Sequence, residues 1–512
     1  MEFMKVSEIR ALERNAIWLG LSESEMMEQA GRGVAEAVQG VCKPDSPVVV
    51  LCGTGHNGGD GMVAARLLSS AGFEVRVGLL GKSQDLKPPM SDKFGLLKKM
   101  ATVTVVESLN DDVARKLVED AGCIVVALVG TGVKGPLREP LKTVVHTVNE
   151  QAAFKVAVDV PPGIDPDTGA KDEVSLRADL VVAIHARKPY LSSGLNHVVV
   201  PIGIPREAAL LVGPGDAAPL IHRRKSTDRK GMAGKVLVIG GSREFSGAPA
   251  LAALGAMRTG CDLAVVASPE AAAPTIRSYS PALIVHPLPG DHLDHRGIED
   301  LVPRLPSYDS FVVGMGLGRD EETMEAVTEL VAQLKETRKP FILDADALHA
   351  LRGATQVGGV LTPHAGEFEA LTGHPPPAEP PEGEADFWKK LSVRSSDVVK
   401  AARRLGSVVL LKGKFDVITD GNRLKLDGTG NPGMAVGGTG DVLSGVIGTF
   451  LAWGNDPFSA AVGGSFVVGS AGDLTSQNLG YHMLATDLIE QIPDVMRQLE
   501  AMNRELDGNL TS

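Results

Sequence analysis

Short apolar runs alternate with longer stretches of helical periodicity in the first part of the chain. Runs of strand length stand at 47–52, 73–80, 123–130 and 154–160, and each ends in a loop rich in Gly or Pro. Between these runs, apolar residues recur at the spacing of a helix that buries one face. Strands that alternate with helices predict a parallel sheet with helices on both faces.

The first forty residues predict two helices that precede this sheet. Ser22 is followed by Glu25 at the spacing of a capping box, in which two side chains satisfy free N–H groups at a helix start. Apolar residues then fall on one stripe of the second helix. They are Met26, Met27, Ala30, Val34 and Val38.

The same alternation starts again in the second part of the chain. Strand-like runs followed by loops occur at 234–242, 262–269, 309–318, 339–348 and 359–367, and 407–426 predicts a strand and a β-hairpin that turns at Asp420-Gly421. Between the two patterns lies a polar segment with the basic run HRRKSTDRK. We therefore predict an α/β protein with domains over 1–210 and 233–505 and a linker over 211–232.

One segment of the second domain has an unusual composition. Residues 374–387 contain five prolines and four acidic residues, with no Lys or Arg. Such a segment buries little apolar surface. We interpret it as a solvated surface insertion that carries no chemistry.

Charge and cysteine content exclude several function classes. The 51 Lys and Arg residues against 63 Asp and Glu give a net charge of −12, which does not suit a nucleic-acid-binding surface. No apolar run approaches the roughly 18 residues of a membrane helix, and the charged start of the chain is unlike a signal peptide. The four cysteines form no CxxC pair, so neither a zinc site nor a disulfide framework is indicated. We expect a cytoplasmic protein that binds neither nucleic acid nor a membrane.

The strongest candidate for chemistry is the run Gly437-Gly438-Thr439-Gly440-Asp441, which opens a predicted helix. Glycines at a helix start let backbone N–H groups hold a phosphate at the positive end of the helix dipole. A carboxylate beside that phosphate can take a proton from a hydroxyl that attacks it. The alternative is a helix cap with glycines for packing. No GK[ST] ending is present, so this is not a P-loop.

Several motifs of the second domain together carry a resemblance. The sequence NPGMAVGGTGDVLSG, with Lys412-Gly413 at the end of the preceding strand, resembles the ribokinase-like family of small-molecule kinases. The motifs KVLVIGGS, GMGLGRD, LDADALH and TPHAGEF narrow this resemblance to the ADP-dependent NAD(P)H-hydrate dehydratase branch, over about residues 235–445. The resemblance implies a ribokinase-like three-layer α/β/α domain. It also implies an enzyme that uses ADP and Mg²⁺ to phosphorylate the C6 hydroxyl of a hydrated nicotinamide ring and then eliminates phosphate.

The resemblance assigns roles to residues of this domain. Asp441 would be the catalytic base and would also contact the substrate, NADH hydrate or NADPH hydrate, together with Gly316, Gly318 and His364. Residues around the nucleotide would be Lys412, Gly413, Lys414, Phe415, Asp416, Gly437, Gly438, Thr439 and Gly440. From the residues alone, His364 could equally stabilise its loop, and Asp344 and Asp346 could be helix caps or metal ligands.

The first domain resembles the NAD(P)H-hydrate epimerase domain that is commonly fused ahead of the dehydratase. The motifs are MEQAGRGVAE, GTGHNGGDGMVAARLL, GTGVKGPLREP, VDVPPGID and ADLVVAIHARKP, over about residues 5–205. The resemblance implies a Rossmann-like three-layer parallel sheet, with Asp159 as a catalytic and substrate-binding residue. The other substrate-binding residues would be His56, Asn57, Gly58, Gly59, Asp60, Gly130, Thr131, Gly132, Val133, Lys134, Gly135 and Pro136.

A potassium ion is implied near Asn57, but this sequence departs from the family pattern there. Val126 and Pro162 stand where relatives usually have an Asp and a Ser around the ion. A cation shell that loses a carboxylate and a hydroxyl is short of hard oxygen ligands. Potassium binding is therefore possible at best, and the first domain is either a working epimerase or a scaffold retained by the fusion.

The leading interpretation is a bifunctional enzyme that repairs hydrated NADH and NADPH, with family members that assemble as homo-oligomers. An alternative is a ribokinase-fold kinase of a vitamin precursor, fused to a nucleotide-binding module, which the GGTGD motif alone would permit. A third interpretation, for the first domain only, is a module that senses nicotinamide nucleotides without converting them.

Overall fold

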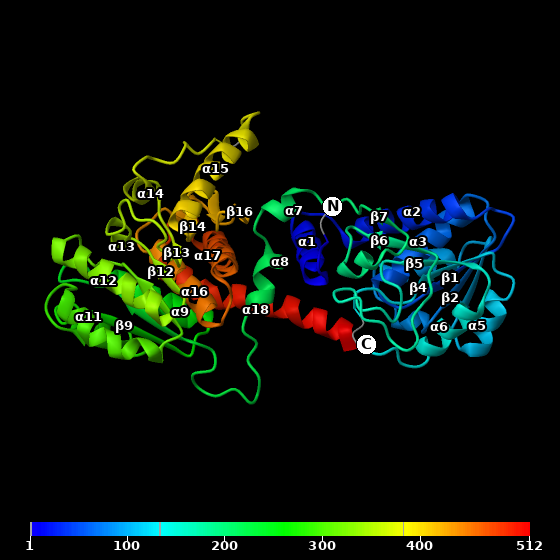
Figure 1. Ribbon diagram of the computed structural model, residues 1–512, viewed down its shortest axis with the longest axis horizontal. Coiled ribbons are helices and arrows are strands. Elements are labelled where there is room, and N and C mark those ends of the chain that lie inside the picture. Colours follow the sequence, from blue (N-terminus) through cyan, green and yellow to red (C-terminus); the bar gives the residue numbers. More distant parts are fainter. Residues whose placement is uncertain (1–2, 133–134, 382, 512) are drawn as a thin grey trace. The chain divides into compact units, whose positions relative to one another are not determined.

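The computed structural model describes residues 3–132, 135–381 and 383–511, with side chains as far as residue 504. The chain divides into two compact units, one drawn from Met1–Ala208 with Glu505–Ser512 and the other from Ala209–Arg504. Figure 1 labels the elements of both units. Val133 and Lys134, which we predicted to bind substrate, lie outside the described residues.

The first unit contains a fully parallel sheet of seven strands in the order β3-β2-β1-β4-β5-β6-β7. The strands are β1 (Val48–Cys52), β2 (Val75–Leu79), β3 (Val103–Glu107), β4 (Cys123–Ala127), β5 (Phe154–Val158), β6 (Leu180–Ile184) and β7 (His197–Val200). The helices are α1 (Val6–Trp18), α2 (Glu23–Val41), α3 (His56–Ser70), α4 (Met90–Leu97), α5 (Asp111–Val118) and α6 (Leu141–Glu150).

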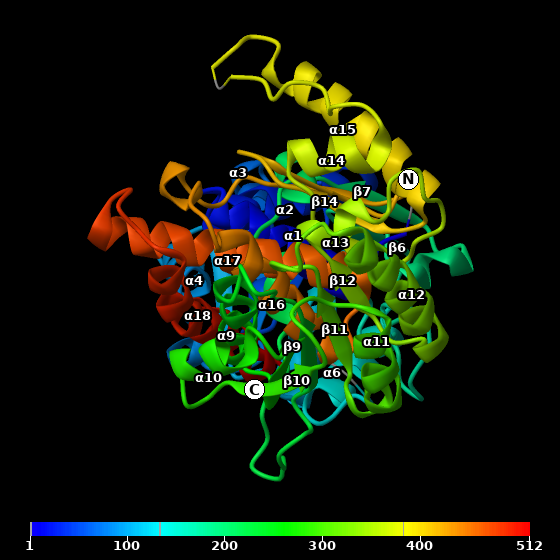
Figure 2. The same ribbon diagram turned by 90° about the vertical axis from the view of Figure 1, so that its left-hand side faces the viewer.

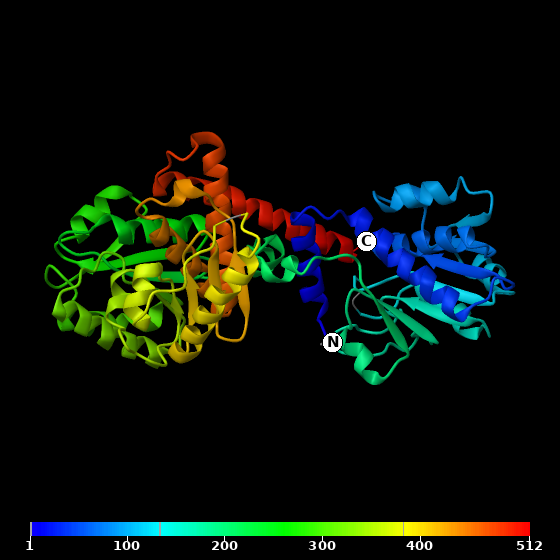
Figure 3. The ribbon, with the colours of Figure 1, turned by 90° about the horizontal axis from the view of Figure 1, so that it is seen from above.

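The two faces of this sheet are covered by different helices. One apolar core joins the strands to α2, α3 and α4, and a second joins them to α5 and α6. A second view of these layers is given in Figure 3. Strand order reverses between β1 and β4, so the loops that follow these two strands diverge and leave a crevice at the carboxyl edge of the sheet.

The second unit contains nine strands in the order β10-β9-β8-β11-β12-β13-β14-β15-β16. They are β8 (Lys235–Ile239), β9 (Leu263–Pro269), β10 (Ile284–Leu288), β11 (Ser310–Val313), β12 (Phe341–Leu343), β13 (Val360–Leu361), β14 (Val408–Leu411), β15 (Asp416–Thr419) and β16 (Leu424–Asp427). The strands are parallel up to β14, and β15 and β16 form an antiparallel hairpin at the edge. The predicted turn at Asp420-Gly421 is thereby confirmed.

Helices cover both faces of this second sheet as well. They are α7 (Glu207–Leu210), α8 (Pro214–Ala217), α9 (Gly247–Thr259), α10 (Ala273–Tyr279), α11 (His295–Leu301), α12 (Glu321–Thr337), α13 (Asp346–His349), α14 (Ala365–Thr372), α15 (Phe387–Leu405), α16 (Thr439–Ala452), α17 (Pro457–Leu479) and α18 (Ala485–Thr511). One core packs α9, α16, α17 and α18 on the sheet and the other packs α11, α12, α14 and α15. Figure 2 shows α9 on one side of these strands and α11 and α12 on the other. The predicted α/β class, with two layered sheet domains, is confirmed.

Two local expectations have different outcomes. Ser22 and Glu25 form the predicted capping box at the start of α2. The predicted linker over 211–232 is not a free connection along its whole length, because Val212 N–H donates to the Leu426 carbonyl at 2.8 Å and the Val212 and Ile221 side chains are buried in the core of the second unit. The polar composition of the segment as a whole did not predict that these two apolar side chains would be buried.

Candidate active sites

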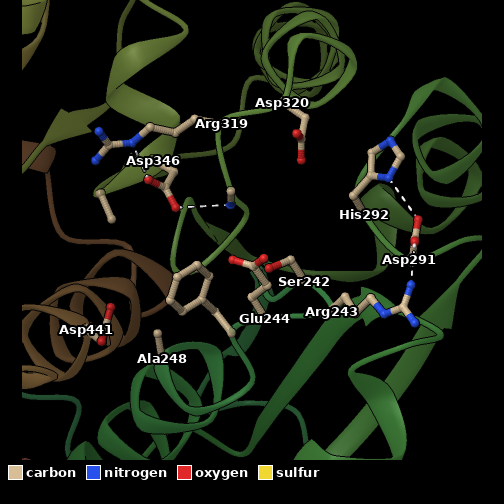
Figure 4. A pocket seen from close by; sticks show the side chains of 14 residues that line it. Ser242, Arg243, Glu244, Ala248, Asp291, His292, Arg319, Asp320, Asp346 and Asp441 are labelled. Carbon is tan, nitrogen blue, oxygen red and sulfur yellow. Dashed lines mark hydrogen bonds and ion pairs between the residues drawn. The ribbon is translucent and has the colours of Figure 1, made fainter.

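The crevice of the second unit opens where its strand order reverses, between β8 and β11. A cavity of about 820 Å³ lies there, and Figure 4 shows its side chains. Three predicted substrate-binding residues, Gly316, Gly318 and Asp441, line it together. The other lining residues are Ser242, Arg243, Glu244, Phe245, Ala248, Asp291, His292, Arg319, Asp320, Ala345 and Asp346.

The predicted glycine-rich loop leads directly into α16. Gly438 has φ +100° and caps the helix, a backbone conformation that side chains rarely adopt. Asp441 therefore stands in the first turn of the helix, beside free backbone N–H groups at its positive end. The Thr439 hydroxyl donates to the carbonyls of Met434 and Val436, so it holds the loop that precedes the helix.

An ion pair between the partly buried Lys412 and the buried Asp344 lies directly against this loop. Lys412 Nζ is 2.9 Å from Asp344 Oδ1 and 3.8 Å from Glu367 Oε2. Ser444 Oγ donates to the other Asp344 oxygen at 2.9 Å, so both oxygens of this carboxylate, which is 1% exposed, are engaged. A Cβ atom on Gly440 would lie 3.2 Å from Lys412 Nζ. Gly440 thus lets the ammonium approach the helix start, where it can attract an anion.

The Asp441 carboxyl has a pKa suited to proton transfer near neutral pH. Burial raises its pKa to about 7, and the negative charge of Asp344 adds to the effect, while Lys412 opposes it. A base whose pKa lies near the working pH is effective in both accepting and releasing a proton. Burial alone would lower the pKa of Lys412, but Asp344 and Glu367 raise it, so the ammonium keeps its charge.

The predicted nucleotide-binding segment 412–416 joins β14 to β15. Asp416 Oδ1 accepts from Gly413 N–H at 2.9 Å, and Ser465 Oγ lies 3.1 Å from the other Asp416 oxygen. Burial and the neighbouring Asp427 raise the pKa of Asp416 to about 7. Asp416 therefore shapes the loop from inside the fold.

Two other residues of the second unit have resolved local roles. His364 caps α14: its Nδ1 accepts from Gly366 N–H at 3.0 Å and from Glu367 N–H at 3.3 Å, and it is not among the described residues that line the cavity. Asp346 accepts from Gly318 N–H at 3.1 Å and from Arg319 Nε at 2.9 Å (Figure 4). Asp346 thus fixes the turn that carries the predicted substrate-binding glycines.

The candidate site of the first unit centres on Asp159, which follows β5. Asp159 adopts φ +65°, a strained conformation for a residue with a side chain, and such strain concentrates at functional sites. Three contacts maintain it. Lys188, whose side chain is 1% exposed, forms an ion pair with Asp159 Oδ1, Ile184 N–H donates to the same oxygen at 3.2 Å, and Tyr190 OH donates to the Asp159 carbonyl at 2.6 Å.

Residues after β1 and β4 approach the same point. Gly130 lies between Asn57 and Asp159: a Cβ atom on it would be 3.4 Å from Asn57 Cβ and 3.6 Å from Asp159 Oδ2. Asn57 Nδ2 donates to the Val129 carbonyl at 2.7 Å, which ties the two loops together. The Thr131 carbonyl accepts from Arg10 Nη2 at 3.1 Å.

The glycines of this site serve packing as much as access. A Cβ on Gly58 would lie 1.9 Å from the Gly53 carbonyl oxygen, and one on Gly59 would lie 2.5 Å from the Met27 side chain. Gly130, Gly135 and Pro136 line a cavity of about 290 Å³, and Asp159 is not among the described residues that line it. The predicted Gly132 adjoins the undescribed residues 133–134.

Two further carboxyl groups near Asp159 have raised pKa values, so they can carry protons near neutral pH. Burial and the charge of Asp159 raise the pKa of Glu13 to about 7. Burial and the same neighbour hold the pKa of Asp60 well above its ordinary value. His56 lies 3.5 Å from Glu23, and the hydrogen bond to that carboxylate raises the pKa of the imidazole. Groups with shifted pKa values around one carboxylate are typical of acid–base sites.

The side chains at the expected potassium position do not fit the ion. Asn57 Oδ1 is buried with no hydrogen-bond partner in the described structure, so one oxygen is available. Val126 and Pro162, however, place hydrocarbon where two oxygen ligands are expected, and Val126 is fully buried. In the part of the chain that is described, no group of three or more His, Cys, Asp or Glu side chains is arranged to hold a metal.

The sequence alone did not identify the cationic partners of Asp159 and Asp344. Lys188 stood within the motif ADLVVAIHARKP, but nothing in its spacing linked it to Asp159, 29 positions earlier. For Asp344 the residues alone allow a helix cap or a metal ligand, and the structure shows an ion pair with Lys412, 68 positions away, that neither alternative includes.

The fold and these two sites define a two-domain α/β enzyme with a separate candidate active site in each domain. Comparison with known proteins gives the family. A sequence model described as NAD(P)H-hydrate dehydratase matches residues 236–494, and one described as YjeF-related protein N-terminus matches residues 23–190. The bifunctional NAD(P)H-hydrate repair enzyme Nnr of Pyrobaculum aerophilum is 45% identical, with 97% of this chain and 99% of the relative covered.

A second relative agrees. The protein of the same name from Archaeoglobus fulgidus is 39% identical, again with 97% of this chain and 99% of the relative covered. The chain belongs to the family of bifunctional NAD(P)H-hydrate repair enzymes, and the resemblance seen in its motifs is confirmed. Among solved structures, an ADP/ATP-dependent NAD(P)H-hydrate dehydratase from Bacillus subtilis, co-crystallized with ATP/Mg²⁺, is 27% identical with a TM-score of 0.47, over 57% of this chain and 99% of that one. None of the helices in the described residues is both long and apolar enough to cross a membrane.

Proposed function

We propose that the second unit dehydrates the S form of NADH hydrate and NADPH hydrate at the expense of ADP, giving AMP and phosphate. The observation that carries this proposal is the approach of Lys412 to the start of α16, where Asp441 in the first turn of the helix lines the cavity. A base, a cation and free backbone N–H groups at one place are what phosphoryl transfer to a hydroxyl requires.

Each group has a separate task in this mechanism. Asp441 takes the proton of the C6 hydroxyl group while the hydroxyl oxygen attacks the terminal phosphorus of ADP, and AMP leaves. Lys412 and the N–H groups around Gly438 stabilise the charge on the transferred phosphoryl group. Phosphate then leaves C6 with loss of a proton from the neighbouring ring carbon, which restores the double bond. Mg²⁺ bound to the nucleotide phosphates would neutralise part of their charge.

For the first unit we propose interconversion of the R and S hydrates, so that both can be repaired. Asp159 would take the proton of the C6 hydroxyl as the C6–N1 bond opens to an aldehyde, and the ring nitrogen, after it receives a proton, would add back to the other face of that carbonyl. Lys188 would hold the Asp159 carboxylate in its strained position. The raised pKa values of Glu13 and Asp60 allow one of them to return a proton to the substrate. No step of this interconversion uses potassium.

Three attributes complete the proposal. The cysteines of the described chain, Cys42, Cys52, Cys123 and Cys261, are free thiols. Free thiols suit the reducing cytoplasm, where we place the enzyme. Homo-oligomerisation stays a prediction from the family resemblance.

The test of the dehydratase half uses S-NADH hydrate with ADP and Mg²⁺. Native protein should restore the absorbance of the reduced nicotinamide with one AMP formed per NADH, and Asp441→Asn should not. Accumulation of a stable phosphorylated product without NADH would contradict the dehydratase and favour the vitamin-kinase alternative. In the test of the epimerase half, R-NADH hydrate should give S-NADH hydrate without ADP, and Asp159→Asn should abolish that conversion.

A further inference from the structure

Most described residues of the proline-rich insertion at 374–387 are exposed, as its composition predicted, but the residues around Glu379 are anchored to the fold. Pro376 and Pro380 are buried. Arg394 of α15, which is 4% exposed, donates from Nη1 to the Pro377 carbonyl at 2.6 Å. Figure 2 shows the insertion as the yellow segment that leads into α15. The insertion is thus anchored on both sides of residue 379.

This anchoring places the Glu379 carboxylate on the predicted nucleotide-binding loop. Glu379 Oε1 accepts from Phe415 N–H at 2.7 Å. A Cβ atom on Gly413 would lie 3.0 Å from Oε2 and 3.1 Å from Oε1, so the carboxylate packs closely on the backbone at this glycine. The Phe415 ring in turn packs edge-on against Phe387, at 5.5 Å between ring centroids.

One oxygen of this carboxylate remains open. Among the residues that the structure describes, Oε2 accepts no hydrogen bond, whereas Oε1 is held by the backbone. A carboxylate repels phosphate but accepts strongly from a neutral hydroxyl group. A ligand group that meets Oε2 above Gly413 should therefore be a hydrogen-bond donor, such as a hydroxyl group.

The loop consequently has opposite polarity at its two ends. Lys412, beside Gly440 and the start of α16, offers positive charge for phosphate. The Glu379 carboxylate lies against Gly413 and Phe415, one and three residues after Lys412, and offers a hydrogen-bond acceptor there. A nucleoside diphosphate has the matching order of groups, with anionic phosphates at one end and ribose hydroxyls next to them.

We propose that Glu379 binds a ribose hydroxyl of the nucleotide co-substrate and makes the site select ribonucleotides over deoxyribonucleotides. This inference rests on the proposed use of ADP in the second unit. The insertion is then one wall of the nucleotide site, held ready before the nucleotide binds, which limits the entropy lost on binding.

Calorimetric titration of the full chain with ADP, 2′-deoxy-ADP and 3′-deoxy-ADP tests this, without hydrated substrate. Native protein should bind ADP about tenfold or more tightly than at least one deoxy analogue, as expected for a hydrogen bond to a charged group. In Glu379→Ala the affinity for ADP should fall to that of the analogue, whose own affinity changes less than about twofold. Glu379→Gln, which keeps an acceptor oxygen, should retain part of the preference.

Two further variants keep the test decisive. Glu384→Ala, in the same insertion but paired with Lys390, should bind all three nucleotides as the native protein does. Gly413→Ala should shift the carboxylate by a few tenths of an ångström and reduce the preference even with Glu379 present. An ADP preference that survives Glu379→Ala, or tighter ADP binding by both Glu379 variants, would overturn the inference. Failure of native protein to bind ADP at all would instead refute the proposed function.

Discussion

Asp441→Asn should stabilise the second unit while it abolishes dehydration. The Asp441 pKa is raised from 3.8 to about 7 because the carboxyl is buried near Asp344. In the unfolded chain this group ionises above about pH 4, whereas in the folded protein it stays protonated until about pH 7. Folding therefore becomes less favourable as the pH rises between these values, and the loss is complete above about pH 7.

The magnitude follows from the same values. The difference between 3.8 and about 7 corresponds to about 4 kcal/mol, at about 1.4 kcal/mol for each pKa unit. Asp441 is only partly shielded from solvent, so we expect about 2 kcal/mol in practice. An Asn side chain has the same size and no charge, so at about pH 8 the variant should melt about 4 °C higher than the native protein.

The assay is thermal unfolding of native protein and variant across the pH range. The stabilisation should shrink as the pH falls from about 7 and disappear below about pH 4, where Asp441 of the native protein becomes protonated in the unfolded chain as well. Glu325→Gln, an exposed carboxylate on α12, removes the same charge and should give no comparable gain. A native dehydration rate that rises with pH through about 7 would agree with Asp441 as the base. Equal melting temperatures at about pH 8, or a rate that falls over this range, would refute the reasoning.

Three further predictions concern the other groups. Lys412→Met should cost about 3 kcal/mol because it leaves Asp344 buried without its cation. Adding Asp344→Asn should recover stability in urea unfolding but not the binding of ADP, and recovery of both would contradict a phosphate role for Lys412. Lys188→Met should abolish R-to-S conversion, followed by chiral chromatography, but leave dehydration of the S hydrate intact, followed by nicotinamide absorbance. A variant that still converts R to S would show that the reaction does not need Lys188. Replacing potassium by sodium in the buffer should leave R-to-S conversion unchanged, since Val126 and Pro162 bring no oxygen ligand; a strict potassium requirement would show that backbone oxygens suffice.

Local patterns predicted the elements and the glycine-rich loop but not the ion pairs that surround it. Asp441 could be placed at a helix start because Gly437–Gly440 and the apolar helix that follows are contiguous in sequence. Asp344 follows β12 and Lys412 follows β14, and these two strands are not neighbours in the sheet because β13 separates them. Their contact depends on two loops that bend toward each other, and no spacing in the sequence encodes it.

Composition does not reveal the few residues that anchor an otherwise polar segment. The segment at 374–387 reads as solvated because it is rich in proline and acid, but two buried prolines and the hydrogen bond from Arg394 fix Glu379 on the loop before β15. The predicted linker over 211–232 behaves in the same way, because the buried side chains of Val212 and Ile221 anchor an otherwise polar stretch. Average polarity says little about individual anchoring contacts.

The most direct test of the central claim, that one chain repairs both isomers, starts from an equal mixture of R- and S-NADH hydrate with ADP and Mg²⁺. The account predicts full recovery of NADH absorbance in native protein, with no slow final phase. Asp159→Asn should stop near half recovery, and Asp441→Asn should give none. Native protein that stops at half recovery would show that the first unit is a scaffold, and the absence of ADP-dependent recovery would contradict the assignment of the second.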